Sequence, residues 1–217
     1  MTVSTMQPQE NATVFVVDDD LSYLRSLSRL LGAMGYRVES FVSAHDFFAR
    51  SGPERPGCVV ADMQMPGING LQLQYGLRKS ANPLPVVFLT GQGDIPTTVT
   101  AMRGGAEDFL TKRSSKEEIM SAVERALTRD ARERQERFRL RELTDRLNGL
   151  SDREKEVLSH VVQGKMNKEI AADLKINLRT VKLHRTHITR KLHVQSVAEL
   201  TRLVDEIVAF KSRQATR

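Results

Sequence analysis

Cysteine and long apolar runs are nearly absent from this sequence, and each absence excludes a class of protein. The single cysteine, Cys58, excludes an intramolecular disulfide, and its apolar surroundings, PGCVVAD, favour a buried side chain over a reactive thiol. No apolar run approaches the roughly 18 residues of a membrane-spanning helix. The N-terminal residues MTVSTMQPQENAT lack the apolar core of a secretion signal. We therefore expect a cytoplasmic protein that has no membrane partner.

The positive charge of the chain is concentrated at its C-terminal end. The 217 residues suffice for two domains and carry a net charge of +6. Residues 1–127 contain 12 Lys and Arg against 14 Asp and Glu, and residues 128–148 contain 7 against 5. Residues 149–217 contain 14 against 8. This asymmetry indicates a polyanionic partner for the C-terminal part, although a solvated basic face would have the same composition.

The first half of the chain alternates strand-like apolar runs with amphipathic helix-like stretches. The predicted strands are residues 14–17, 37–41, 58–61 and 85–89, with a weaker fifth that ends at Leu110. Such alternation with short loops predicts a parallel sheet with helices on both faces.

From Ser115 onward the pattern is helical. Residues 129–141 are mostly charged, which is typical of a connecting helix or a flexible linker, since a helix without an apolar face does not bury itself. An apolar seam with three- and four-residue spacing follows, formed by Leu140, Leu143, Leu147 and Leu150. This seam could pair two chains or dock onto the next domain.

Several acids, a hydroxyl and a lysine come at the ends of the predicted strands: Asp18, Asp19 and Asp20 after the first, Asp62 after the third, Thr90 after the fourth and Lys112 after the fifth. The carboxyl ends of parallel strands meet at one edge of the sheet, where ligands bind. Clustered carboxylates favour a cation, and oxygen ligands suit Mg²⁺ (or Mn²⁺). A carboxylate beside such an ion can accept a phosphoryl group. The pattern predicts a phosphorylation site, although Asp20 could instead cap the following helix.

Four segments, VFVVDDD, VVADMQMPGINGLQL, VVFLTGQGDIPTTVTAM and GGAEDFLTK, resemble the receiver domain of two-component response regulators. The resemblance covers about residues 12–127 and implies a flavodoxin-like α/β fold with a five-stranded parallel sheet. It implies that Asp62 accepts a phosphoryl group from a sensor histidine kinase. It also implies a Mg²⁺ site formed by Asp18, Asp19, Asp62 and the backbone carbonyl of Gln64.

The same resemblance implies a switch beside the phosphorylation site. Thr90 and Lys112 would contact the phosphoryl group, and Phe109 matches the aromatic residue that rotates inward as Thr90 moves. The sequence departs from the family at Arg113, where receivers usually have a proline after the lysine. Because a cis peptide bond is unfavourable without proline, we expect a trans bond here, which puts the position of Lys112 in doubt.

The chain beyond Gly149 is predicted to be an all-α domain of four helices. Ser151 and Glu154 have the spacing of a capping box at the start of the first helix. The third helix, LRTVKLHRTHITRKL, has an apolar face and a basic face. A short helix, a tight turn and a basic exposed helix favour insertion into the major groove of DNA, although a protein-interaction domain with a basic surface would fit as well.

Four further segments, SDREKEVL, GKMNKEIAADL, RTVKLHRTHITRKL and SVAEL, resemble the LuxR-type helix-turn-helix. The whole chain therefore resembles the NarL/FixJ group of response regulators, nearest its FixJ-like branch. By position, the residues expected to contact bases are Lys182, Leu183 and Thr186. Those expected to contact DNA phosphates are Lys168, Thr180, His184, His187, Arg190 and Lys191, of which the two histidines could instead serve packing or capping. In this family the last helix, here residues 196–210, often dimerises the DNA-binding domain.

These observations predict five segments: a flexible N-terminus (1–11), a receiver domain (12–127), a helical linker (128–148), a LuxR-type domain (149–212) and a flexible tail (213–217). The predicted function is a transcription regulator, not an enzyme, that binds promoter or operator DNA as a phosphorylation-dependent homodimer. Arg113 leaves open a receiver that acts without phosphate. A Mg²⁺-dependent phosphatase is disfavoured, because Gln64 stands where such enzymes usually have a second acid.

Overall fold

The chain forms two compact units that share one long helix. The computed structural model describes residues 12–50, 55–80, 83–91 and 94–215. The units divide between Arg134 and Gln135, inside α5 (Lys116–Asn148) and within the predicted linker segment. That segment is therefore helical and not irregular. Of the segments predicted to be flexible, 1–11 lies outside the described residues, and residues 213–215 belong to the last helix.

The first unit is built on a five-stranded parallel sheet with the strand order β2-β1-β3-β4-β5. Its strands are β1 (Thr13–Val17), β2 (Arg37–Phe41), β3 (Gly57–Asp62), β4 (Val86–Thr90) and β5 (Asp108–Thr111). Every residue of β1, β3 and β4 is buried, which explains why these runs are apolar without alternation. The predicted sheet is confirmed, and each predicted strand agrees with the structure to within one residue.

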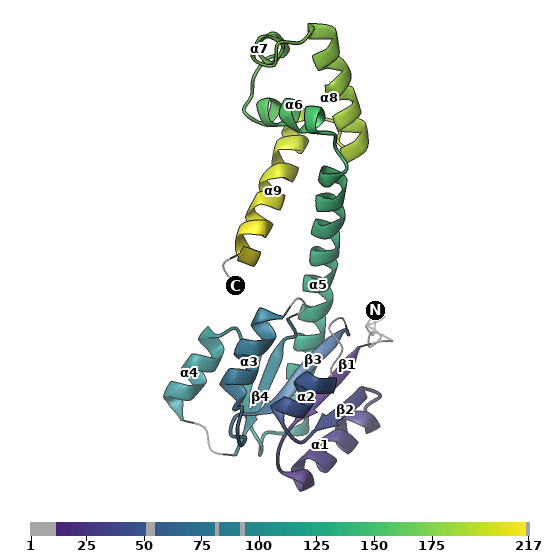
Figure 1. Ribbon diagram of the computed structural model, residues 1–217. Coiled ribbons are helices and arrows are strands. Elements are labelled where there is room, and N and C mark those ends of the chain that lie inside the picture. Colours follow the sequence, from purple (N-terminus) through teal and green to yellow (C-terminus); the bar gives the residue numbers. More distant parts are fainter. Residues whose placement is uncertain (1–11, 51–54, 81–82, 92–93, 216–217) are drawn as a thin grey trace. The chain divides into compact units, whose positions relative to one another are not determined.

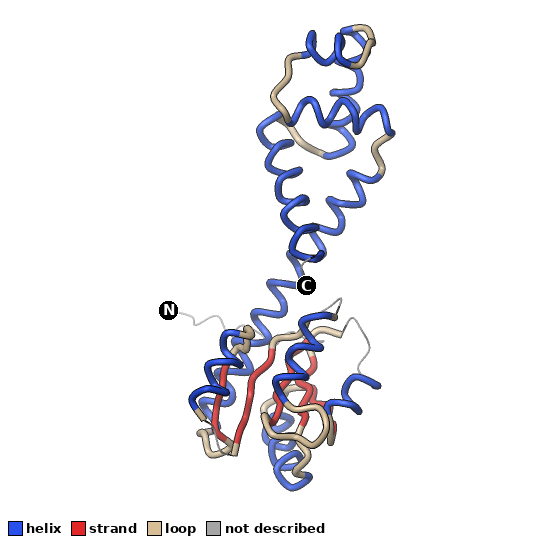
Figure 2. The backbone as a smooth tube through the Cα atoms, turned by 60° about the vertical axis from the view of Figure 1, so that its left-hand side comes forward, coloured by secondary structure: helices blue, strands red, loops and turns tan. Residues whose placement is uncertain are grey.

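Helices cover both faces of this sheet, as Figures 1 and 2 show. α1 (Leu21–Ala33) and the first part of α5 pack on the face that carries Val14 and Val16. α2 (Ala44–Arg50), α3 (Gly70–Lys79) and α4 (Ile95–Arg103) pack on the face that carries Phe15 and Phe88. Because both faces are covered, the carboxyl-terminal edge of the sheet is the place where a site can form.

Polar contacts hold the charged middle of α5 against the first unit. The sequence pattern did not predict this packing, because the segment has no apolar face. The Asp130 side chain is 1% exposed, and its Oδ2 accepts a 3.0 Å hydrogen bond from the backbone N–H of Gly57. At Gly57 a Cβ would lie 1.9 Å from a backbone carbonyl oxygen of β1, so only glycine fits there. Arg134 contacts Asp130 and donates to the backbone carbonyl of Arg55 at 3.0 Å. Periodicity missed this docking because charged and main-chain groups form it.

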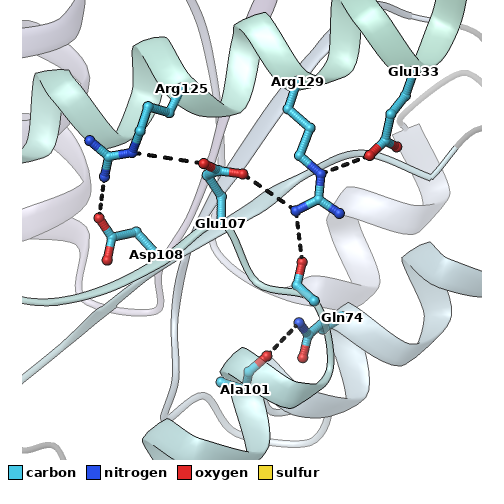
Figure 3. Close-up of polar contacts among 8 residues, drawn as sticks. Gln74, Ala101, Glu107, Asp108, Arg125, Arg129 and Glu133 are labelled. Carbon is cyan, nitrogen blue, oxygen red and sulfur yellow. Dashed lines mark hydrogen bonds and ion pairs between the residues drawn. The ribbon is translucent and has the colours of Figure 1, made fainter.

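A second polar network joins α5 to the segment that leads into β5 (Figure 3). The Arg129 guanidinium donates to the carbonyl of Gly105 at 3.2 Å and lies 3.3 Å from the Glu107 carboxylate. Arg125, one turn earlier, contacts both Glu107 and Asp108. The start of β5 and the helix are thus held together within the first unit.

The second unit contains the end of α5 and four further helices: α6 (Asp152–Val162), α7 (Asn167–Asp173), α8 (Leu178–Leu192) and α9 (Val197–Ala215). Its core takes buried apolar side chains from each of these four helices, among them Val157, Ile170, Ile188 and Leu200. The predicted four-helix, all-α domain is confirmed. No helix in the described part of the chain is long and apolar enough to cross a membrane.

The leucine seam at the end of α5 packs inside this second unit. Leu150 is buried in the core, and Leu143 and Leu147 pack against it. A 2.7 Å ion pair also joins Arg139 of α5 to Glu206 of α9. Of the two roles that the sequence left open, docking onto the next domain accounts for these three leucines.

Candidate functional site

Three carboxylates meet at the carboxyl-terminal edge of the sheet. Asp18 and Asp19 follow β1 directly, and Asp62 ends β3. Because β1 and β3 are neighbours in the sheet, one carboxylate oxygen of each residue lies within 4.8 Å of the others. Asp18 and Asp62 are 2% and 7% exposed, whereas Asp19 is open to solvent. The structure therefore brings together the acids that the strand ends predicted.

The ammonium of Lys112 lies between two of these carboxylates. Its Nζ is 2.7 Å from Oδ2 of Asp18 and 2.9 Å from Oδ2 of Asp62. The described residues contain no cis peptide bond, so the bond from Lys112 to Arg113 is trans, as expected. Lys112 nevertheless reaches both acids, which removes the doubt that Arg113 raised about its position.

The cluster carries more negative than positive charge. Burial raises the pKa of Asp18 above its usual range, and hydrogen bonds from Lys112 and from a backbone N–H only partly offset this rise. Burial also acts to lower the pKa of Lys112, but its hydrogen bonds to Asp18 and Asp62 raise the pKa overall. The ammonium of Lys112 thus pairs with two of the three carboxylates, and a cation is the ordinary partner for the remaining negative charge.

Asp20 and Gln64 flank the cluster in different roles. Oδ1 of Asp20 accepts hydrogen bonds from the backbone N–H groups of Ser22 and Tyr23 at 2.8 and 3.2 Å, so Asp20 caps α1. This is the capping role that the sequence left open. Gln64 is exposed, and its backbone N–H donates to Oδ1 of Asp62 at 3.2 Å. The backbone of Gln64 is therefore held beside the predicted phosphorylation site.

Thr90 lies on β4, the strand next to that of Asp62, and Phe109 lies on β5, one strand further along the sheet. Thr90 ends β4 and is 1% exposed, and its carbonyl accepts a 2.8 Å hydrogen bond from the backbone N–H of Lys112. Phe109 of β5 is half-buried, and its ring centre is 6.2 Å from that of Phe88. It borders a hollow of about 200 Å³, lined by the loop after β3 and by the start of α4. The Phe109 ring thus forms part of the wall of this hollow.

Sequence patterns did not single out Tyr23, although it belongs to the cluster. Nζ of Lys112 is 4.7 Å from the centre of the Tyr23 ring, within the range of a cation–π contact. Burial raises the pKa of the Tyr23 phenol. Tyr23 is in the first turn of α1, directly after the Asp20 cap, so the short connection from β1 was a signal for its position.

α7 and α8 form the predicted helix-turn-helix. α7 ends at Asp173, and Lys175 in the turn has a left-handed φ of +51°. Asn177 then caps α8 by accepting a 2.9 Å hydrogen bond from the backbone N–H of Arg179. Arg185 of α8 donates to Asn167 at the start of α7 at 2.9 Å, which joins the two helices.

The predicted DNA contacts divide by exposure. The buried face of α8 is formed by Val181, Ile188 and Leu192, which are at most 1% exposed. Six of the predicted contact residues are exposed: Lys168, Lys182, Leu183, Thr186, Arg190 and Lys191. Three are half-buried: Thr180, His184 and His187. Within the described part of the chain, the buried Nδ1 of His184 has no hydrogen-bond partner, so part of this ring serves packing.

A buried carboxylate between α6 and α8 was missed as a tertiary contact. Oε2 of Glu154 accepts hydrogen bonds from Nζ of Lys191 at 2.7 Å and from the backbone N–H of Ser151 at 2.8 Å. Its Oε1 is 3.8 Å from Nδ1 of His187. These hydrogen bonds, that of Lys191 foremost, lower the pKa of Glu154 from 4.5 to about 2. Two predicted phosphate contacts, Lys191 and His187, therefore face a carboxylate in the free protein.

Comparisons with known proteins match both units. The family model of the response regulator receiver domain matches residues 14–124, and that of bacterial regulatory proteins of the luxR family matches residues 148–204. Nodulation protein W of Bradyrhizobium diazoefficiens is 39% identical over 196 residues, which cover 90% of this chain and 86% of that protein. The transcriptional regulatory protein FixJ of Azorhizobium caulinodans is 39% identical over 194 residues, which cover 89% and 92%.

Solved structures give the same assignment. The response regulator StyR is 43% identical with a TM-score of 0.78, and the match covers 90% of this chain and 99% of that one. Full-length FixJ from B. japonicum is 31% identical with a TM-score of 0.55, and the match covers 91% and 98%. The family consists of DNA-binding transcription regulators and not of enzymes, which excludes the phosphatase alternative. The chain is thus a response regulator of the NarL/FixJ group, with a receiver domain followed by a LuxR-type DNA-binding domain.

Proposed function

We propose that this protein regulates transcription from promoter or operator DNA, and that a sensor histidine kinase controls it by transferring a phosphoryl group to Asp62. The observation that carries the proposal is the site at the sheet edge, where three carboxylates lie within 4.8 Å and Lys112 lies between two of them. The receiver would span residues 12–127, the linker 128–148 and the DNA-binding domain 149–212. Since both the kinase domain and chromosomal DNA face the cytoplasm, the protein would act there.

The donor set of this cluster fits Mg²⁺ or Mn²⁺. All of its side-chain donors are oxygens, and one ammonium leaves their charge only partly neutralised. Asp18, Asp19 and Asp62 would hold the ion, with the backbone carbonyl of Gln64 as a further ligand. When bound, the ion neutralises negative charge on the incoming phosphoryl oxygens.

Asp62, at the end of the central strand β3, is the proposed acceptor of the phosphoryl group. An oxygen of Asp62 forms the new P–O bond while the P–N bond to the kinase histidine breaks and the imidazole leaves with its electron pair. The Lys112 ammonium, 2.9 Å from Asp62, neutralises charge on the transferred oxygens. The Thr90 hydroxyl would then donate to the phosphoryl group, and Phe109 would move into the space beside it. These movements would favour a homodimer.

α8 is the proposed recognition helix of that dimer. Lys182, Leu183 and Thr186 are exposed in its first three turns and would contact base edges. The proposed phosphate contacts include Lys168, Thr180, His184 and Arg190, which set the position of the helix on the duplex. Two copies would bind half-sites about one helical turn of DNA apart.

Acetyl phosphate with Mg²⁺ tests this proposal. The wild type should gain one phosphoryl group by intact mass, and should bind a duplex that it selects from a random pool about 10-fold more tightly. Asp62→Asn should gain neither. Asp46→Asn, a half-buried carboxylate on α2 outside the cluster, is the matched control and should behave as the wild type.

Two results would contradict the proposal. Equal gains in DNA affinity by the wild type and Asp62→Asn would show that Asp62 is not the switch. A wild type that acquires no acyl phosphate, from acetyl phosphate or from a kinase, would favour a receiver that acts without phosphate.

A further inference from the structure

Glu154 occupies a special position in the second unit. Among the described side chains of that unit, it is the one charged group that is buried, at 3% exposed. It belongs to α6, whereas its partner Lys191 lies in the last turn of α8, 37 positions along the chain. A buried carboxylate that accepts hydrogen bonds from two parts of the chain is a specific contact between two helices, because a shift of either helix breaks it.

Both partners of Glu154 on α8 lie on one flank of the helix. His187 and Lys191 are four residues apart, so they are neighbours on the helix surface. At about 100° per residue this flank and the side that carries Lys182 and Thr186 lie on opposite sides of the buried face. The carboxylate is itself fixed, because it accepts the backbone N–H of Ser151 at the start of α6. It therefore restrains rotation of α8 about its own axis.

We propose that Glu154 is a positioning residue for DNA recognition, which sets the rotation of α8 against α6 by holding Lys191 and His187. The inference rests on the proposed role of α8, and it replaces the phosphate contacts expected for those two residues. Base-edge hydrogen bonds tolerate little misplacement, whereas mobile cations bind phosphates in many orientations. Loss of the Glu154 contact should therefore reduce specific binding and spare non-specific binding.

Two duplexes and a range of salt concentrations test the proposal on the full-length protein. One duplex is the sequence that the wild type selects from a random pool, and the other is a scrambled duplex of the same composition. Glu154→Gln retains an oxygen to cap Ser151 but removes the charge. Its affinity for the selected duplex should fall about 10-fold, with unchanged affinity for the scrambled duplex and an unchanged salt slope. Lys191→Gln should behave alike, and the double variant should be no weaker than either single variant.

Arg190→Gln is the matched control, because Arg190 is an exposed neighbour on the same helix. Because Arg190 is a proposed phosphate contact, Arg190→Gln should weaken binding to both duplexes and reduce the salt slope by about one. The proposal is overturned if Lys191→Gln follows this control pattern, or if Glu154→Gln tightens binding to both duplexes by releasing the lysine.

Hydrogen exchange of the free protein tests the same restraint without DNA. Glu154→Gln and Lys191→Gln should each speed exchange of the α8 amides relative to those of α3 in the receiver. Unchanged exchange in α8 would overturn the inference even for a protein that bound no DNA. By contrast, a wild type that selects no DNA sequence contradicts the proposed function alone. Should Glu154→Gln fail to fold, Lys191→Gln, whose side chain is 41% exposed, supports the same measurements.

Discussion

The receiver and the DNA-binding unit each contain a buried carboxylate next to a lysine, but the ratio of negative to positive charge differs between the two clusters. In the receiver, three carboxylates gather around one lysine, Lys112, which contacts two of them, and burial raises the pKa of Asp18. In the second unit, Glu154 pairs with Lys191, and hydrogen bonds lower its pKa to about 2. Unbalanced charge makes the first cluster suitable for a cation and a phosphoryl group. Balanced charge makes the second a contact between helices.

Among the changes that test this comparison, removal of the receiver lysine should have the largest effect, and that effect is on the rate of phosphorylation. Lys112→Met should slow labelling by acetyl phosphate by about 100-fold or more, because it removes a positive charge aimed at the transferred oxygens. The rate is measured by intact mass over time. Lys116→Met, an exposed lysine at the start of α5, is the control. Equal rates in both variants would mean that Lys112, like Lys191, is only a structural partner of its acids.

The excess of acid in the receiver should make its stability depend on the metal. At a Mg²⁺ concentration about 100 times the Kd, the wild-type receiver should gain about 2.7 kcal/mol. Because the pKa of Asp18 is raised from 3.8, its ionised form is less favourable in the folded chain at neutral pH. Asp18→Asn should therefore be more stable than the wild type without Mg²⁺, and should respond less to the ion. Thermal unfolding with and without Mg²⁺ measures both effects, and an equal Mg²⁺ response in the two proteins would exclude Asp18 as a ligand.

The contribution of the Glu154–Lys191 pair to the stability of the fold should instead depend on pH. The pKa of Glu154 is lowered from 4.5 to about 2, so its contribution to stability is present above pH 4.5 and is lost as the pH falls toward 2. Glu154→Gln should be less stable than the wild type by about 1–2 kcal/mol at neutral pH, and this difference should shrink in acid. Unfolding of the two proteins from pH 7 to pH 2 gives the difference. Glu156→Gln, at an exposed glutamate on the same helix, is the control and should change the stability at neutral pH by no more than about 0.5 kcal/mol.

Substitution of Arg113 should have the smallest effect on the rate of phosphorylation. Its side chain is exposed, and Lys112 reaches both acids with a trans bond before Arg113. Arg113→Ala should therefore change the labelling rate by no more than about twofold, as expected for an exposed substitution. A large loss of rate would show that the arginine itself takes part in binding the phosphodonor.

Local patterns were sufficient wherever a run of apolar residues or a short-range spacing fixes which side chains are buried. The apolar strands of the receiver were predicted to within one residue, because parallel strands covered on both faces must be continuously apolar. The acids at the strand ends could be grouped for the same reason, since topology brings those ends to one edge. The Asp20 cap and the Ser151 capping box also follow from short-range spacing.

Contacts between charged groups that are distant in sequence could not be predicted in this way. Asp130 on the backbone of Gly57 and Glu154 with Lys191 involve residues that composition assigns to solvent-exposed faces. The seam of leucines had two possible partners until the packing of α5 in the second unit was known. In each case the local pattern shows that a group needs a partner without showing which one.

The amino-acid sequence by itself determined the two domain types, the sheet and the residues gathered at its edge, because hydrophobic periodicity and strand-end position are local properties of the chain. Only the tertiary structure decided that Lys112 reaches Asp62 despite Arg113, that α5 is docked by buried Asp130, and that Lys191 is held by Glu154. The physical reason is that an ion pair has no periodicity. A charged side chain is exposed or buried according to the partner that the fold places beside it.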